Sequence, residues 1–101
     1  MLDDAAPLFV QIAELVASDI ASGALDEGAR APSTNELAAF HRVNPATAAK
    51  GLNLLVDRGL LDKRRGLGMF VAPGARERLL QERRTRFVQD FVIPLLTEAD
   101  H

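Results

Sequence analysis

The chain has 101 residues and a mass of 10.9 kDa, which allows one small domain with an appended element and excludes two full-sized domains. Hydrophobic residues make up 48% of the chain and charged residues 26%, so the composition is that of a folding globular protein rather than a disordered one. The absence of cysteine excludes a disulfide framework and a thiolate metal site, and we predict neither a metal nor a cofactor.

The net charge of −2 hides an uneven distribution along the chain. Residues 1–29 carry six acidic residues and no Lys or Arg, residues 30–72 carry seven basic and three acidic residues, and residues 73–101 carry five of each. The negative net charge argues against a nucleic-acid partner, because proteins that bind nucleic acids usually present a basic surface. The basic middle segment, however, predicts a surface that meets an anion on one side only.

The chain carries no sign of export or of membrane insertion. Asp3 and Asp4 stand where a signal peptide carries basic residues, and the longest apolar run, residues 91–96, is far shorter than the roughly 20 residues that span a bilayer. We therefore expect a cytoplasmic protein without a membrane partner.

The first predicted element is an amphipathic helix that follows a flexible arm of residues 1–6. Pro7 suits its first turn and Gly23 suits a left-handed stop beyond its end. Its apolar positions recur at three- and four-residue intervals: Leu8, Phe9, Ile12, Leu15, Val16 and Ile20. Before Pro32 the chain is expected to be extended.

Two more helices are predicted in close succession. Ser33 and Glu36 form a capping-box pattern that starts a short helix. After a turn of about three residues, Asn44 as N-cap and Pro45 at the first helical position start another helix, which ends at Gly59. Two helices in this arrangement describe a helix-turn-helix.

A β-hairpin is predicted to follow, with strands over residues 60–65 and 69–71 joined by Gly66, Leu67 and Gly68. The fold class is therefore mainly α with a small β-hairpin (α+β): a winged helix-turn-helix over residues 7–72. A phosphate-binding loop is disfavoured at these glycines, because such loops lie between a strand and a helix.

Residues 73–101 are predicted to form a C-terminal helical dimerisation tail, helical to about residue 99 and interrupted at Pro94. Its apolar stripe can pack back on the winged domain. We favour the same helix of a second copy as its partner, because a charged stretch of some twelve residues separates the stripe from the core. The predicted dimerisation residues are Leu80, Phe87, Val88, Phe91, Val92, Leu95 and Leu96.

The candidate DNA-binding residues lie on the helix-turn-helix and the wing. A helix-turn-helix inserts the N-terminal part of its second helix into the major groove, where Thr47 and Lys50 can read bases. Helix N-termini and wing cations favour phosphates, although pure capping is an equal role for Ser33. The full set is Ser33, Thr34, Asn35, Arg42, Asn44, Pro45, Ala46, Thr47, Ala49, Lys50, Asn53, Lys63, Arg64, Arg65, Gly66, Leu67 and Gly68.

Residues 7–72 resemble the DNA-binding domain of GntR-family bacterial transcription regulators. The resemblance rests on the runs Gly28-Ala29-Arg30-Ala31-Pro32-Ser33, Asn35-Glu36-Leu37-Ala38, Val43-Asn44-Pro45-Ala46-Thr47 and Arg65-Gly66-Leu67-Gly68-Met69-Phe70-Val71. The Asn-Pro pair and the short tail are similar to the YtrA-like subfamily. The resemblance implies a homodimeric repressor of an inverted-repeat operator, often of a transporter operon or of its own gene.

Three positions depart from the family pattern. The family usually has arginine at Asn35, many members have arginine at Pro45, and the wing tip often has a basic residue at Leu67. The resemblance therefore implies fewer charged contacts from helix two and the wing tip than in other members, with Arg64 and Arg65 carrying the wing contacts.

Two other classes of function compete with DNA binding. An enzyme is not expected, because neither His41 nor His101 has a nucleophile or a paired carboxylate at a spacing typical of a catalytic site. A winged-helix module that binds a partner protein remains the alternative. A small-molecule effector, if one exists, would bind where the tail meets the winged domain or the second subunit, because the tail alone is too short to enclose it.

Overall fold

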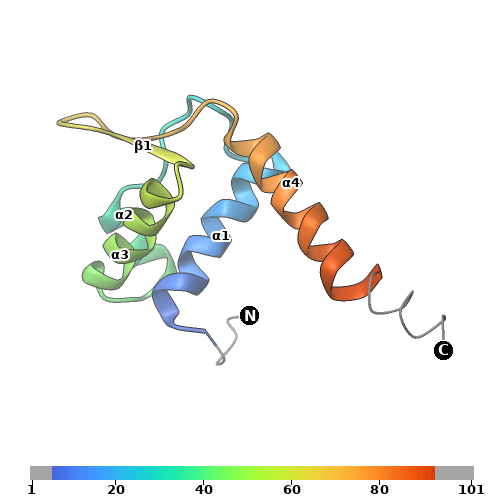
Figure 1. Ribbon diagram of the computed structural model, residues 1–101. Helices are drawn as coiled ribbons and strands as arrows, with labels where there is room; N and C mark the ends of the chain where they lie inside the picture. The colour runs from blue at the N-terminus through green and yellow to red at the C-terminus, as the bar shows by residue number, and fades with distance from the viewer. Residues whose placement is uncertain (1–5, 93–101) are drawn as a thin grey trace.

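The computed structural model describes the backbone of residues 6–92 and the side chains of residues 6–91. The elements in chain order are α1 (Leu8–Ser22), α2 (Thr34–His41), α3 (Pro45–Asp57), β1 (Leu61–Arg64), β2 (Gly68–Val71), α4 (Ala75–Phe87) and a π-helical turn, η1 (Val88–Val92). Helices α1 to α3 pack together, the hairpin projects from them, and α4 leads away (Figure 1). The predicted winged helix-turn-helix with a C-terminal helix is confirmed.

The short-range signals in the sequence produce the helix boundaries as predicted. Ser33 and Glu36 form the reciprocal capping box at α2, and the Asn44 side chain accepts a hydrogen bond from the Ala46 N–H at 2.8 Å at α3. Gly23 ends α1 in the left-handed conformation at a φ of 86°. Pro7 lies just before the first turn of α1 rather than within it.

The buried face of α1 differs from the predicted stripe. Leu8 and Leu15 are 40% and 41% exposed, and the buried positions include Ala13, Ala17 and Ala21. The small side chains allow neighbouring helices to approach α1 closely, which moves the contact surface away from the larger leucines. The largest fully buried side chains are Ile12, Ile20, Leu52, Leu55, Leu60, Leu61, Val71 and Leu79.

The hairpin pairs Leu61 with Val71 and Arg64 with Gly68 in antiparallel register. The extended segment before α2 forms a further edge on β2, where the Val71 N–H donates to the Ala29 carbonyl at 2.9 Å. The Ala31 N–H donates to the Met69 carbonyl at 2.8 Å, so the chain before α2 is tied to the wing.

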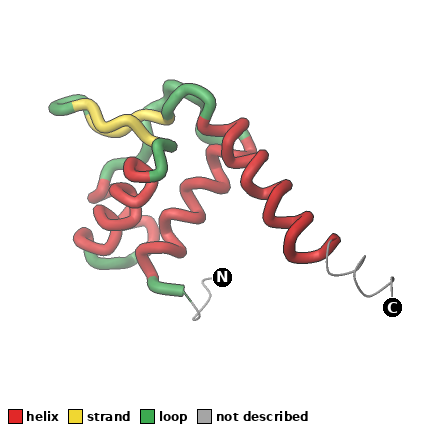
Figure 2. Tube along the Cα trace, viewed as in Figure 1, coloured by secondary structure: helices red, strands yellow, loops and turns green. Residues whose placement is uncertain are grey.

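Helix α4 begins on the core, not apart from it, which corrects the expectation of a charged spacer. Ala75 and Leu79 are buried against the winged domain, and Leu80 is partly buried on the same core. Arg76 donates to the Ala21 carbonyl and Arg83 to the Ser18 hydroxyl, each at 3.1 Å, because long arginines can lie along a neighbouring helix. Only the later part of α4 leaves the domain (Figure 2). Pro94, Leu95 and Leu96 lie outside the described residues, as does most of the predicted arm of residues 1–6.

Candidate nucleic-acid interface

The N-terminal half of α3 presents a face of small and polar side chains to solvent. Ala46, Lys50 and Asn53 are exposed, and Thr47 and Ala49 are half-buried beside them. The opposite face of the helix is buried through Ala48, Gly51, Leu52 and Leu55. This division is the one expected of a helix that packs on one side and enters a DNA groove on the other.

Lys50 has an aromatic neighbour that the sequence alone did not predict. Its ammonium lies 4.2 Å from the centroid of the Phe9 ring, a cation–π distance. Phe9 is on α1, so this contact restrains the lysine at the edge between α1 and α3. A restrained lysine side chain loses less conformational entropy on contacting a base or phosphate than an unrestrained lysine side chain does.

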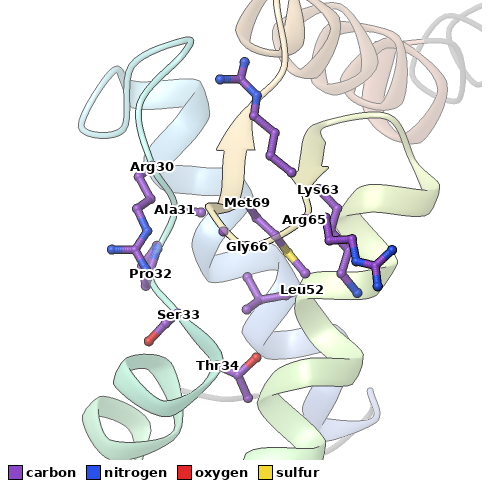
Figure 3. Close-up of a pocket in the computed structure, with 12 residues that line it drawn as sticks. Arg30, Ala31, Pro32, Ser33, Thr34, Leu52, Lys63, Arg65, Gly66 and Met69 are labelled. Carbon is purple, nitrogen blue, oxygen red and sulfur yellow. The ribbon is translucent and has the colours of Figure 1, made fainter.

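A basic crevice of about 310 Å³ separates the start of α2 from the wing. Arg30, Ser33 and Thr34 line one side, and Leu52 and Met69 lie between the two sides (Figure 3). The hairpin contributes Lys63, Arg64, Arg65, Gly66 and Gly68. The lining thus holds four cations and no carboxylate, which is the chemistry of a phosphate-binding surface.

Arg30 is a member of this crevice that was not among the predicted contacts. It is exposed, and a Cβ on Gly68 would lie 2.9 Å from its Nε, so the arginine side chain lies directly against the hairpin at this glycine. Gly68 has a φ of 112°, a conformation that favours glycine. The signal in the sequence was the place of Arg30 in the basic segment just before Pro32 and Ser33.

The capping box controls which groups the start of α2 can offer to an anion. The Ser33 hydroxyl accepts from the Glu36 N–H at 3.1 Å, and the Glu36 carboxylate accepts from the Ser33 N–H at 3.0 Å. The backbone and side-chain hydrogen bonds of Ser33 hold the pKa of Glu36 below its usual 4.5, with a contribution from the charge of Arg30. At pH values above the ordinary carboxyl pKa, the ionised Glu36 therefore stabilises the fold through the cap. This stabilisation is lost as the pH falls through the lowered pKa of the folded protein. Ser33 and Asn35 as DNA contacts stay predictions.

The wing is basic along its strand and apolar at its tip. Lys63 and Arg65 are exposed, and Arg64 lies with its guanidinium 4.5 Å from the Phe70 ring centroid. Leu67 is 64% exposed at the tip, where a φ of 77° at Gly66 closes the turn. The stacked Arg64 is held near the strand, and Arg65 is free of any such ring contact among the described residues.

Arg42 adopts a backbone conformation that arginine disfavours. It ends α2 at a φ of 55° and ψ of 47°, the left-handed region, and is exposed at the turn between the two helices. A non-glycine residue in this region stores strain. Its N–H donates to the Ala38 carbonyl, so this conformation closes the end of α2, and Arg42 as a contact to the DNA backbone stays a prediction.

We predict that Arg42→Gly stabilises the protein and weakens its binding to DNA. Removing the Cβ relieves the left-handed strain and should raise the free energy of unfolding by about 0.5–1 kcal/mol. Losing the cation should lower DNA affinity. Urea unfolding and a fluorescence titration with duplex DNA measure the two effects. Arg42→Lys is the control, since it keeps both the strain and the charge; equal stability of the two variants would contradict the strain argument.

Arg58 joins the end of α3 to two other helices. Its Nη1 donates to Glu14 of α1 and its Nη2 to Glu82 of α4, each at 3.0 Å. Arg78 of α4 donates to the carbonyls of Arg58 and Gly59. The base of α4 is therefore held directly against the end of the exposed helix α3.

Comparison with known proteins assigns the fold to a family. Residues 8–71 match the family described as bacterial regulatory proteins, gntR family. The chain belongs to the GntR family. The matched segment includes all of α1 to β2, so it contains both the exposed face of α3 and the basic crevice.

Relatives in the GntR family extend the similarity beyond the winged domain. The transcriptional repressor YtrA of Bacillus subtilis is 27% identical over 95 residues, which are 94% of this chain and 72% of YtrA. A GntR family regulator from Listeria monocytogenes, 23% identical, has the same fold with a TM-score of 0.86 over 97% of this chain and 88% of its own. Three other curated relatives are longer, and this chain spans only about a quarter of their length.

Solved relatives include complexes with DNA. The DNA-binding domain of AraR bound to its operator ORX1 is 33% identical, with a TM-score of 0.65 over 70% of this chain and 87% of that one. Within residues 6–92 of the present GntR protein, no helix is long and apolar enough to cross a membrane. No group of three His, Cys, Asp or Glu residues that could hold a metal ion is found in the same range.

Proposed function

We propose that this GntR protein is a sequence-specific DNA-binding transcription regulator that acts as a cytoplasmic repressor. The observation that carries the proposal is the basic crevice of Arg30, Lys63, Arg64 and Arg65 beside α3. The crevice supplies phosphate contacts, and the exposed start of α3 supplies base contacts. Support comes from the operator complex of AraR and from the description of YtrA as a repressor.

In the proposed complex the start of α3 enters the major groove. Thr47 offers a methyl group to thymine or its hydroxyl to a base edge, and Lys50 donates to guanine or phosphate. Ala46 and Ala49 allow the helix backbone to approach the bases closely. The cations of the crevice hold the flanking phosphates, including Arg30, which the structure adds to the predicted set.

Base reading by α3 predicts that Thr47→Ala and Lys50→Gln change the preferred half-site. Selection from a random-site library measures the consensus of each variant. Asp57→Asn is the matched control, because Asp57 is exposed on the same helix but lies at its far end. The control should keep the original consensus. A consensus that is identical for all four proteins would contradict base reading by these two residues.

We also propose that the protein is a YtrA-like homodimer on an inverted-repeat operator, held through the C-terminal tail. Support comes from the exposed apolar side chains of Phe87, Val88 and Phe91, which are 58%, 43% and 57% exposed. Val92, Leu95 and Leu96 complete the proposed set, and Leu80, partly buried on the core, lies at its base. Following the family resemblance of the sequence, we propose that the operator belongs to a transporter operon or to the protein's own gene.

A footprint on the DNA upstream of its own gene tests the proposal directly. A dimeric regulator should protect two half-sites with centres about one helical turn, or a multiple of it, apart. We assign no catalytic step to the chain. Salt-dependent retention on heparin supports the DNA-binding proposal, and indifference to heparin would instead favour a module that binds another protein.

A further inference from the structure

An apolar groove of about 520 Å³ lies between α1 and α2, apart from the basic crevice. Phe40 stands at its edge with 82% of its surface exposed, more than any other large hydrophobic residue of the described chain. The lining residues are Leu15, Val16, Asp19, Pro32, Glu36, Leu37, Phe40 and His41. An exposed aromatic residue beside an apolar hollow is the usual form of a protein contact site.

The groove has an acidic rim, which excludes DNA as its occupant. Asp19 and Glu36 line it and no lysine or arginine does. Helix α1 carries no basic residue at all. His41 lies edge-on to Phe40 with the ring centroids 4.9 Å apart, so the His41 ring packs against the Phe40 ring at the edge of the groove. The groove therefore suits an apolar segment that is flanked by cations.

The end of α4 has the matching chemistry. Phe87 and Phe91 form a ring pair with centroids 5.3 Å apart, and Val88 lies exposed beside them. Arg86 is exposed on the same helical stretch together with one carboxylate, Asp90, while Arg84 pairs with Glu77 at 3.2 Å. The apolar cluster is complementary to the groove in hydrophobicity, and Arg86 is the cation that would meet the acidic rim.

The α4 of the same chain is not placed to fill this groove. It packs on the side of α1 that carries Ser18 and Ala21, through hydrogen bonds from Arg83 and Arg76. At about 100° per residue around a helix, the groove residues Val16 and Asp19 lie roughly 100–160° from Ser18 and Ala21, and Leu15, about 60° from Ser18, lies between the two sides. From its contact with α1, α4 leads away from the domain (Figures 1 and 2).

We propose that the groove between α1 and α2 receives the α4 end of a second copy of this chain, and that the second copy receives the first in return. Two identical exchanged contacts make a closed, isologous dimer. This inference rests on the proposed homodimer and names the surface that the tail contacts. It places Phe87, Val88 and Phe91 against Leu15 and Phe40 of the second copy, in place of the helix-to-helix pairing expected from the sequence.

Disulfide trapping tests the arrangement, because the chain has no cysteine of its own. Leu15→Cys and Val88→Cys are prepared separately, mixed and oxidised; the mixed disulfide is the expected product. Leu67→Cys is the matched control, since Leu67 is an exposed apolar residue on the wing. It should not cross-link to Val88→Cys. A rapid disulfide between two Val88→Cys chains, without the mixed product, would overturn the groove contact and favour tail-to-tail pairing.

Sedimentation equilibrium separates failure of this inference from failure of the proposed homodimer. Phe40→Ala should raise the dimer dissociation constant at least tenfold without lowering the unfolding midpoint, because the side chain is exposed in the monomer. Leu67→Ala should leave the constant unchanged. An unaltered dimer in Phe40→Ala would overturn the groove contact alone. A wild-type chain that is monomeric at all concentrations would overturn the homodimer as well.

Discussion

Replacing Gly51 by valine is expected to destabilise the protein by about 3 kcal/mol, because α1 and α3 touch where this glycine stands. A Cβ at Gly51 would lie 2.9 Å from the Phe9 carbonyl oxygen and 3.4 Å from Ile12 Cγ2. The oxygen belongs to the backbone of α1 and cannot move aside without shifting the helix. Thermal unfolding followed by circular dichroism should show a Tm lower by roughly 10–20 °C.

The matched control is Asn53→Val on the exposed face of the same helix. Valine and asparagine have similar helix propensities, and valine is a better helix former than glycine, so propensity alone predicts little change at Asn53 and a gain at Gly51. Only Gly51→Val adds the clash with α1. If both variants lowered the Tm equally, crowding at the α1 contact would not be the cause. The expected outcome is little change in Asn53→Val and a large loss in Gly51→Val.

The helix boundaries of the winged domain could be predicted because short-range chemistry sets them. The capping box of Ser33 and Glu36 needs only four residues to define the start of α2. Asn44 and Pro45 define the start of α3, and Gly23 the end of α1, in the same local way. The hairpin followed from glycines at its turn, although β1 is shorter than predicted and β2 begins one residue earlier than predicted.

Packing between the elements was harder to predict because it depends on residues far apart in sequence. The leucine pattern of α1 suggested that Leu15 is buried, whereas close contact through alanines leaves it 41% exposed. The charged start of α4 suggested a spacer. Two small or apolar positions, Ala75 and Leu79, are enough to dock it, with arginines hydrogen-bonded across α1.

The same limit applies to the candidate site. Thr47 and Lys50 could be placed on an exposed helix face from the local pattern alone. Arg30 could not, because its position depends on the pairing of residues 28–31 with β2. That pairing brings a cation of the segment before α2 to the wing and completes the basic crevice.

Arg64→Ala/Arg65→Ala is expected to weaken binding to all DNA sequences alike and to flatten its salt dependence. Both arginines line the crevice on the wing and reach phosphates rather than base edges in the proposed complex. Each lost phosphate contact lowers the log–log slope of affinity against salt by about 0.9, so the double variant should lose about 1.8. Titrations of specific and nonspecific duplexes at several salt concentrations measure the slope.

Arg76→Gln is the control for the loss of cationic charge, because Arg76 is exposed on α4 and donates to the Ala21 carbonyl, away from both the crevice and the proposed dimer contact. It should leave the salt slope unchanged. Unfolding midpoints must be compared as well, since Arg64 also contacts the Phe70 ring. A folded double variant with the wild-type slope would remove the wing from the DNA contacts. Phosphate binding would then be left to Arg30, Lys63 and the start of α2, which Arg30→Ala would test next on the same titration.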